Sequence, residues 1–208
     1  MSGTDEVPDG ETHAGEAEPG IIRTSPGRIL RDWLVVIAVA LGAAILVRTF
    51  VLQQFYISGP SMETTMYTDD RVLVNKMSYR FSDIGRGDVV VFDRITTNGN
   101  TVAHDDLIKR VIALAGDSIE IKNCEVHLNG KKIVEDYLPE TDTAEPDPAA
   151  RCRVESMRRI VIPEGHVFVM GDNRPESFDS RSFGSIPESL VIGRAFAVVW
   201  PLGSIRGL

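Results

Sequence analysis

One apolar run near the N-terminus constrains this chain more than any other feature of its sequence. Residues 33–47 read WLVVIAVALGAAILV and carry no charge. As an α-helix this run covers about 22 Å, and its continuation past Arg48 to Leu52 reaches the ~30 Å of a bilayer's hydrocarbon core. Arg48 can extend its charged end to the membrane surface, and Trp33 suits the opposite interface. The run therefore predicts one membrane anchor over residues 28–52.

Two alternatives to an anchor follow from the same run. A cleaved signal peptide is disfavoured, because about thirty residues precede the run and no A-x-A cleavage site follows it closely. A helix buried inside a soluble protein is the minor alternative, because the run has no amphipathic period.

The charged residues on either side of the run predict its orientation. Three arginines precede it, at positions 23, 28 and 31, whereas Arg48 is the one basic residue within twenty positions after it. The positive-inside rule then puts residues 1–27 in the cytoplasm and the chain from residue 53 outside the plasma membrane. Residues 1–27 are rich in Asp, Glu, Pro and Gly and poor in apolar side chains, which predicts a disordered acidic tail.

After the anchor, residues 53–208 change to the short apolar runs that are typical of β-strands. Turn-forming pairs such as Asn129-Gly130 separate these runs. Many short strands at near-regular spacing predict a mainly β domain, built as a coiled sheet or barrel-like structure. Residues 118–160 are predicted to be an insertion that holds strands and an acidic, Pro-rich loop at 138–150. The predicted strands are 53–57, 71–76, 88–92, 107–112, 118–121, 126–128, 159–162, 166–169 and 195–200.

Cys124 and Cys152 flank the acidic loop. Outside the membrane, in an oxidising compartment, they can form a disulfide, and two separate thiols are the alternative. The two cysteines and four scattered histidines make no zinc pattern, so no metal and no cofactor are predicted. The net charge of −8 argues against nucleic acid as a partner, because such binding needs a basic surface.

A candidate nucleophile, Ser61, stands at the exit of the turn at 58–60, shortly after the anchor. A serine hydroxyl is a weak nucleophile until a neighbouring base takes its proton. Lys109 lies in the apolar run 107–112, where desolvation would lower its pKa and yield a neutral amine that can act as that base. The adjacent Arg110 cannot do so, because a guanidinium keeps its proton.

The histidines are not predicted to supply the base. One lies on the cytoplasmic side, one lies in a polar loop at 101–106, and two alternate within strand-like runs, with no Asp nearby in a triad-like setting. They are predicted to be surface or hydrogen-bonded residues: His13, His104, His127 and His166.

Four stretches, taken in order, resemble the sequence boxes of the bacterial type I signal peptidases, also called leader peptidases. They are Ser61-Met62 after the glycine turn, GDVVVF at 87–92, Lys109-Arg110 followed by Gly116-Asp117, and GDNR at 171–174 followed by Ser177 and by DSR at 179–181. The resemblance covers about residues 48–208. It implies a serine endopeptidase bound to the plasma membrane of a bacterium. The implied activity is removal of signal peptides from exported preproteins by cleavage after A-x-A sites.

The resemblance also implies roles for single residues. Ser61 would attack the scissile carbonyl, and Lys109 would take the serine proton as general base. Ser177 matches a serine that hydrogen-bonds the lysine amine. Asp179 matches a carboxylate that holds the site together, and its expected ion partners are Arg181 and Arg110.

Two positions depart from the family pattern. Some members have a serine two positions before the nucleophile, where its hydroxyl helps to form the oxyanion hole, and this chain has Gly59. The hole is then expected to rest on backbone N–H groups, chiefly that of Ser61, with Ser58 nearby, and glycine here fits a close approach of backbone to substrate. Thr64 replaces a proline that is common in the family, which is expected to loosen the turn without changing the chemistry.

The family binds its substrate as an added β-strand, which needs free main-chain groups and small apolar pockets. Phe55, Ile57 and Val74 are the candidate pocket walls. The implied partners are signal-peptide-bearing preproteins and the lipid bilayer, and the protein is expected to be a monomer.

Two other functions have to be weighed against this one. A self-cleaving Ser/Lys protease of the same fold would carry a DNA-binding domain and a cleavable linker instead of an anchor. A membrane-tethered β domain that binds a partner without catalysis would have lost Ser61 or Lys109, and both are present. A Ser/His signal peptidase would have histidine in place of Lys109.

Overall fold

The structure is a computed structural model that describes residues 26–98, 101–138 and 151–208, so the predicted acidic tail and most of the acidic loop lie outside the described residues. The chain divides into two units, residues 1–42 and 43–208. Helix α1 (Pro26–Phe50) begins in the first unit, and all of its residues are exposed. At about 1.5 Å per residue it extends for about 37 Å, enough for the ~30 Å hydrocarbon core.

The end of the predicted anchor is corrected by the structure. Among the described residues, α1 is the one helix that is long and apolar enough to cross a membrane, but it ends at Phe50. Leu52, predicted to be part of the anchor, already belongs to strand β1 and is paired with Asn75. Leu52 lies in a strand because pairing with β2 satisfies the backbone N–H and C=O groups of the residues that follow the helix.

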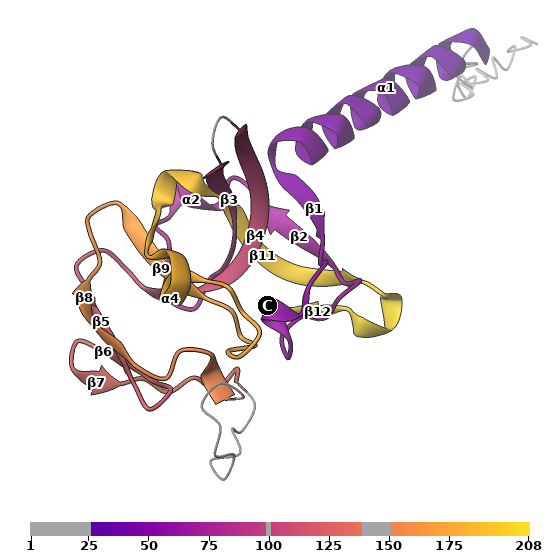
Figure 1. Cartoon of the computed structure of the whole chain (residues 1–208). Coiled ribbons are helices and arrows are strands. Elements are labelled where there is room, and N and C mark those ends of the chain that lie inside the picture. The colour runs from indigo at the N-terminus through magenta and orange to yellow at the C-terminus, as the bar shows by residue number, and fades with distance from the viewer. Residues whose placement is uncertain (1–25, 99–100, 139–150) are drawn as a thin grey trace, which may run out of the picture. The chain divides into compact units, whose positions relative to one another are not determined.

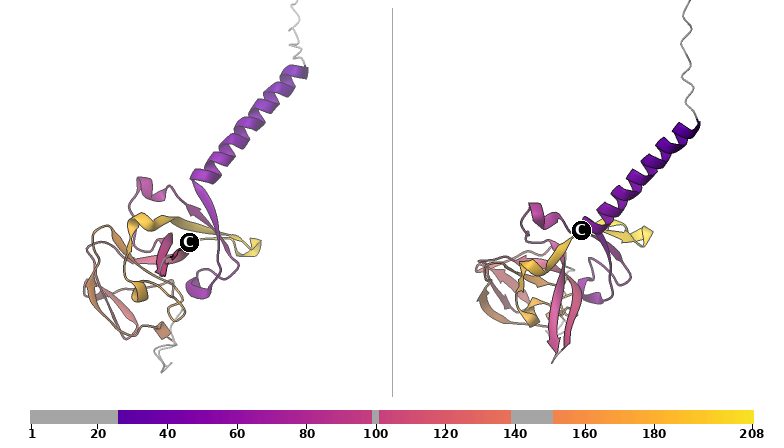
Figure 2. Two further views of the ribbon diagram at one scale, coloured as in Figure 1. Left: turned by 45° about the horizontal axis from the view of Figure 1, so that its top comes forward. Right: turned by 90° about the horizontal axis from the view of Figure 1, so that it is seen from above.

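The second unit contains a larger antiparallel sheet with the order β1-β2-β11-β3-β4-β9-β10, and β12 pairs with β11 (Figures 1 and 2). The prediction of a mainly β domain is confirmed. The strands of this sheet are β1 (Leu52–Tyr56), β2 (Arg71–Asn75), β3 (Val89–Asn98), β4 (Thr101–Ala113), β9 (His166–Met170), β10 (Ile186–Pro187), β11 (Val191–Trp200) and β12 (Arg206–Gly207). Short helical turns connect them: η1 (Pro60–Met62), α2 (Ser78–Phe81), α4 (Ser180–Phe183), η2 (Glu188–Leu190) and η3 (Leu202–Ser204).

The predicted insertion forms a smaller sheet with the order β7-β6-β5-β8. Its strands are β5 (Ser118–Lys122), β6 (Glu125–Leu128), β7 (Lys131–Lys132) and β8 (Met157–Val161). Ile119 and Val126 of this sheet share one buried cluster with Ile112 and Phe168 of the larger sheet. Because the two sheets have a common core, the insertion is part of the same folded unit. A disulfide between Cys124 and Cys152, with Cα atoms 5.5 Å apart, closes this region.

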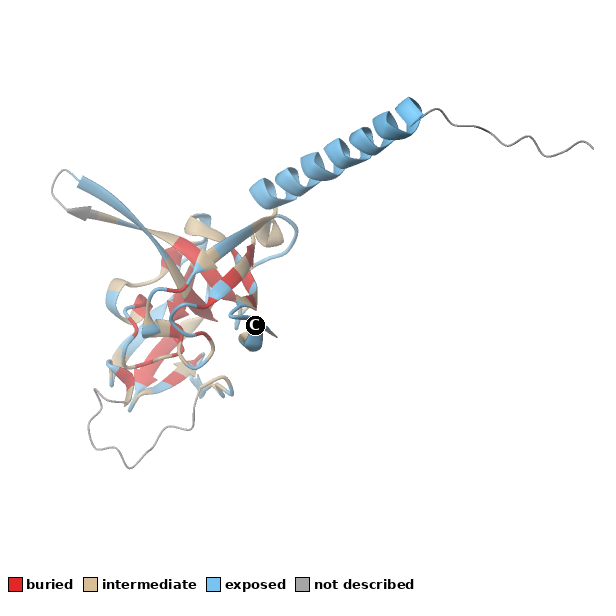
Figure 3. Cartoon of the chain, turned by 90° about the vertical axis from the view of Figure 1, so that its right-hand side faces the viewer, coloured by how far each residue is buried: buried red, intermediate tan, exposed pale blue. Residues whose placement is uncertain are grey.

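The hairpin of β3 and β4 is longer than the sequence predicted. Residues 101–106, predicted as a polar loop, continue β4 and pair with β3 as far as Asn98. In Figure 3 this outer part of the hairpin extends away from the buried core, with the β4 residues exposed and the described β3 residues mostly half-buried. A ribbon with no fully buried face needs no apolar alternation, so the usual sequence signal of a strand is absent. His104 Nδ1 lies 2.6 Å from Asp93 Oδ2 in this ribbon, so this histidine is an exposed, hydrogen-bonded residue, as predicted.

Candidate active site

Ser61 lies in the short helical turn η1, which follows edge strand β1. Pro60 occupies the start of this turn, where its fixed φ and missing N–H are tolerated. Met62, the next residue, is completely buried in the core cluster that also contains Val72 and Val91. The buried methionine fixes the turn on the domain, and Ser61 stands half-exposed above it.

Strand β4 brings Lys109 to Ser61 from 48 positions further along the chain. The amine Nζ lies 2.6 Å from Ser61 Oγ and donates to the carbonyl oxygen of Ile108 at 2.8 Å. Lys109 is only 3% exposed. The two residues that the sequence singled out are therefore within hydrogen-bonding distance, with the lysine buried and the serine half-exposed.

Burial lowers the pKa of Lys109 from 10.5 to about 8. The carboxylates of Asp179 and Asp172 oppose this shift, whereas the charge of Arg181 adds to it. A lysine in such surroundings has an appreciable neutral fraction near neutral pH, and a neutral amine can accept a proton from a serine hydroxyl.

The chain segment after β9 donates hydrogen bonds to the carbonyl oxygens of Ser61 and Pro60. Asn173 donates its backbone N–H to Ser61 O at 3.1 Å and its side-chain Nδ2 to Pro60 O, also at 3.1 Å. Gly171 lies even closer: a Cβ atom there would come within 2.3 Å of Ser61 O and of Ser177 Oγ. In the sequence, Gly171 and Asn173 belong to the GDNR stretch of the family resemblance, but neither residue was predicted to have a part in the site.

A buried ion pair holds the segment after β9 in place. Arg181 Nη2 lies 2.7 Å from Asp179 Oδ2, and both side chains are almost completely buried. Asp179 also accepts the N–H of Gly171 at 3.0 Å. Burial alone would raise the pKa of Asp179, but the hydrogen bond and charge of Arg181 outweigh it and keep this pKa below its usual value. Arg181 further donates to Cys152 O at 2.5 Å, which links the disulfide region to the site.

Arg110 does not pair with Asp179, contrary to the sequence-based expectation. It binds Asp172 through two hydrogen bonds of 2.9 and 2.6 Å. Successive residues on a strand point to opposite faces, so Arg110 faces away from Lys109. Asp172 also accepts a hydrogen bond from Thr65 Oγ1 at 2.5 Å, so the Arg110–Asp172 pair connects β4 to the chain just after Ser61.

The hydrogen bond expected between Ser177 and Lys109 is absent. Ser177 is completely buried, and its hydroxyl lies against Gly171 and contributes to lowering the pKa of Asp179. The Lys109 amine is instead held by Ser61 and by the carbonyl of Ile108.

Gly59 has an extended backbone with φ −156°, a conformation that any residue can adopt. A Cβ atom at this position would meet nothing within 4 Å, so neither sterics nor backbone conformation requires glycine here. Ser58 is exposed. Ser61 lies in the first turn of η1, whose N–H groups have no acceptor within the helix and can serve an oxyanion.

The three predicted pocket residues lie mainly in the core. Ile57 is 4% exposed and Val74 is completely buried, and Phe55 packs against the same cluster while keeping part of its surface. The prediction for Val74 is therefore corrected, because it presents no surface to a substrate in this structure.

Two strand edges border the Ser61–Lys109 pair. Strand β1 is at the edge of the larger sheet. Strand β4 pairs with β3 over residues 101–110, but with β9 only over 110–113. Unpaired main-chain groups on such edges can bind an extended peptide. Among residues 26–98, 101–138 and 151–208, no three His, Cys, Asp or Glu side chains gather as metal ligands would.

Comparison with known proteins finds relatives over most of the chain, and they are signal peptidases, the family that the sequence resembles. Residues 30–200 match the family described as signal peptidase, peptidase S26. The chain is 37% identical over 159 residues to the probable signal peptidase I-2 of Synechocystis sp., covering 76% of this chain and 68% of that protein. It is 35% identical over 189 residues to signal peptidase IB of Staphylococcus aureus, covering 85% and 93%. A crystal structure of a signal peptidase I from Enterococcus faecalis is 27% identical, covers 54% of this chain and 97% of that one, and has a TM-score of 0.41.

Proposed function

The chain belongs to the signal peptidases of peptidase family S26, whose task is to remove signal peptides, and we propose that it does so as a serine endopeptidase in which Ser61 is the nucleophile and Lys109 the general base. The observation that carries this proposal is the 2.6 Å distance between Lys109 Nζ and Ser61 Oγ. The burial of Lys109 supports it, because a pKa of about 8 makes the amine a usable base.

The reaction proceeds in two halves. Neutral Lys109 accepts the proton of Ser61 while Oγ bonds to the scissile carbonyl carbon, and the carbonyl oxygen becomes an oxyanion beside the Ser61 N–H. When the C–N bond breaks, the Lys109 ammonium gives its proton to the leaving amine, so that the mature protein leaves and an ester joins the signal peptide to Ser61. Lys109 then takes a proton from water, the resulting hydroxide attacks the ester, and the proton returns to Ser61 Oγ.

The substrate is proposed to bind as an extended strand between the free edges of β1 and β4. In this arrangement the scissile carbonyl lies between the residue that follows β1 and the lysine on β4. Cleavage after small-x-small sequences such as A-x-A would follow from small apolar pockets, for which Phe55 and Ile57 are the candidate walls.

We further propose the arrangement of the chain at the membrane. Residues 1–27 are the cytoplasmic tail, residues 28–50 span the bilayer, and the catalytic unit lies outside. Since η1 begins ten positions after Phe50 (Pro60), the anchor keeps Ser61 near the outer surface, where signal peptides emerge from the lipid. The protein is proposed to act as a monomer.

The test is cleavage of a preprotein with an A-x-A site by the full-length protein in detergent, followed by N-terminal sequencing of the product. Ser61→Ala and Lys109→Ala should each lower the rate by at least about 10³-fold while the protein stays folded. Lys109→Arg should be equally inactive, because arginine keeps its proton. Exposed residues of the same types provide matched controls, Ser156→Ala and Lys131→Ala, and both should retain full activity.

Substantial cleavage by Ser61→Ala would mean that another nucleophile acts. Cleavage by Lys109→Arg would mean that the base lies elsewhere. Cleavage of the wild type at sites without small residues would remove the proposed A-x-A specificity.

A further inference from the structure

A groove lies at the point where the apolar helix passes into the catalytic unit. Its cavity measures about 420 Å³, within the ~300–1,000 Å³ that is usual for ligand sites. Thr49 and Phe50, the last residues of α1, form part of its wall. Apolar residues of β11, including Ile192, form another part.

Two cations face this groove, Lys76 and Arg80. The backbone N–H of Lys76 donates to Val51 O at 2.9 Å, which holds this lysine directly beside the end of the helix. Arg80 is exposed in α2. Within the described part of the chain, neither side chain belongs to an ion pair, whereas four buried or half-buried arginines of the catalytic unit do: Arg110, Arg174, Arg181 and Arg206.

The other polar groups in the groove leave a positive balance. Glu188 is its one lining carboxylate, so two cations face a single acid. Ser189 and Thr49 add hydroxyl groups that can donate to an anion. A ligand that satisfies all of these groups has a negatively charged, oxygen-rich end and an apolar end.

We propose that this groove binds the headgroup of an anionic phospholipid, of which phosphatidylglycerol is the simplest representative. The phosphate would lie between Lys76 and Arg80, and the acyl chains would run along Phe50 into the bilayer. The inference rests on the membrane anchoring in the proposed function. A lipid is favoured over a free phosphate because the groove is continuous with the end of the membrane-spanning helix and has an apolar wall.

A bound headgroup would also fix the height of the active site above the bilayer. Lys76 directly follows β2, and β2 pairs with β1, the strand that leads to Ser61. Holding Lys76 at the level of the phosphates therefore holds this strand pair. We expect the lipid to favour cleavage of preproteins inserted in a membrane, and to leave hydrolysis of a short soluble peptide unchanged.

The test measures lipid binding directly, with the full chain carrying Ser61→Ala so that the result does not depend on catalysis. Native mass spectrometry counts the phosphatidylglycerol or phosphatidylcholine that the protein retains from mixed micelles. The Lys76→Gln/Arg80→Gln variant should bind phosphatidylglycerol about 30-fold more weakly, from roughly a fivefold loss per cation, and phosphatidylcholine binding should not change.

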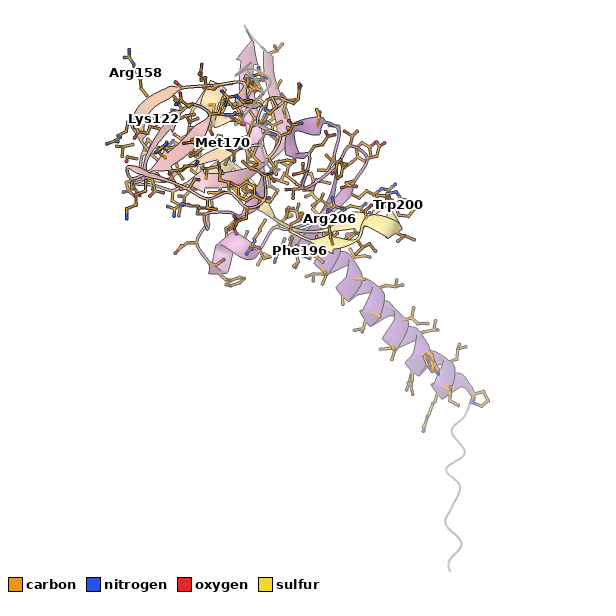
Figure 4. The ribbon with its side chains drawn as sticks, turned by 90° about the horizontal axis from the view of Figure 1, so that it is seen from below. Lys122, Arg158, Met170, Phe196, Trp200 and Arg206 are labelled. Atoms are coloured by element: carbon orange, nitrogen blue, oxygen red, sulfur yellow. A yellow bond between two sulfur atoms is a disulfide. The ribbon has the colours of Figure 1, made fainter. Side chains whose placement is uncertain are left out.

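Two further variants distinguish lipid binding in this groove from attraction of the lipid to positive charge anywhere on the surface. Ser189→Trp fills the groove without changing any charge, and it should weaken phosphatidylglycerol binding as well. Lys131→Gln/Arg158→Gln removes two exposed cations from the smaller sheet, where Figure 4 shows Arg158 extending outward, and it should bind like the parent. Unchanged melting temperatures show that the variants are folded.

Several results would overturn the lipid site. They are equal loss of binding in the control variant, full binding by Ser189→Trp, no preference for phosphatidylglycerol, and displacement of the lipid by millimolar inorganic phosphate. Because binding is measured with the inactive variant, failure of the Ser/Lys mechanism and failure of the lipid site give separate readouts.

Discussion

At the scale of single residues, the site depends on a lysine that is kept in an unfavourable environment. Water would keep the Lys109 ammonium charged, and the core of the domain makes that charge costly. The same burial leaves few directions for the amine, which is held by Ser61 Oγ and the Ile108 carbonyl. One desolvated side chain thus combines the proposed base strength with the required position.

Titration of Lys109 should govern the pH dependence of cleavage. With a pKa of about 8, the neutral form of Lys109 increases as pH rises, so kcat/KM should increase about tenfold between pH ~7 and a plateau above pH ~9. The measurement is kcat/KM on a soluble A-x-A peptide across this range. A profile that is flat, or that bends only near pH ~10.5, would show that the folded protein does not lower the pKa of Lys109.

Gly171 should be intolerant of a side chain. In Gly171→Ala the new Cβ would overlap with Ser61 O and Ser177 Oγ, so the nucleophile must move. A displacement of about 1 Å can cost ~100-fold in rate, and we expect kcat/KM to fall by at least that much. The loss of stability should be about 1–3 kcal/mol, from overpacking.

Gly203→Ala is the control for this substitution, because a Cβ there meets nothing within 4 Å. The two variants are compared by cleavage rate and by urea unfolding. Normal activity in Gly171→Ala would show that the close approach at Ser61 is not needed for catalysis.

At the scale of elements, the site is formed by residues from several segments of the chain and not by one strand. The turn η1, strand β4 and the segment from β9 to α4 each contribute one part. Two buried ion pairs, Arg110–Asp172 and Arg181–Asp179, join these segments. Buried pairs of this kind are sensitive to the loss of one partner, because the remaining charge stays buried and unpaired.

Removing Asp179 should therefore destabilise the protein more than removing the pair. Asp179→Asn leaves the Arg181 guanidinium buried without its carboxylate, which should cost about 3–5 kcal/mol of unfolding free energy. The double variant Asp179→Asn/Arg181→Leu should recover part of this loss. Denaturant unfolding of both single variants and of the double variant measures the coupling, and additive losses would contradict it.

The same carboxylate should contribute to acid sensitivity. The pKa of Asp179 is lower in the folded protein than in the unfolded chain, so its contribution to stability is fully present above the unfolded value of about 3.9. This contribution is lost as pH falls through the folded value. Unfolding free energies of Asp179→Asn should accordingly depend less on pH in this acid range than those of the wild type.

At the scale of the whole molecule, one apolar helix and one β unit divide the work. All residues of the helix are exposed in the described part of the chain, and its composition suits lipid. Within the described residues the β unit has three buried clusters of its own, one of which combines residues of both sheets. Such a division fits an enzyme that meets its substrate at a membrane surface.

The orientation of the chain can be tested with a reporter fused after Leu208. Alkaline phosphatase, which needs disulfides that form outside the cytoplasm, should be active in this fusion, and β-galactosidase should not. Replacing the arginines at positions 23, 28 and 31 by glutamine should reduce the phosphatase activity by weakening the orientation signal. A fusion in which only β-galactosidase is active would reverse the proposed topology.

The sequence by itself determined the features that depend on local composition. An uncharged apolar run of this length predicts a membrane helix whatever the rest of the chain does, because a helix satisfies all of its backbone hydrogen bonds within the lipid. Short strands separated by turn residues predict a β domain. Ser61 and Lys109 were recognisable because each stands in a short pattern of its own, and both lie within residues 30–200, which match the family.

Only the tertiary structure decided which side chains meet. The register of β4 turns Lys109 toward Ser61 and Arg110 toward Asp172, and a slip of one residue would exchange them. The need for Gly171 depends on how closely two distant segments approach. The lowered pKa of Lys109 depends on burial by residues far apart in the chain. Side-chain pairing, close approach and desolvation are properties of packed segments, and no local stretch of sequence contains them.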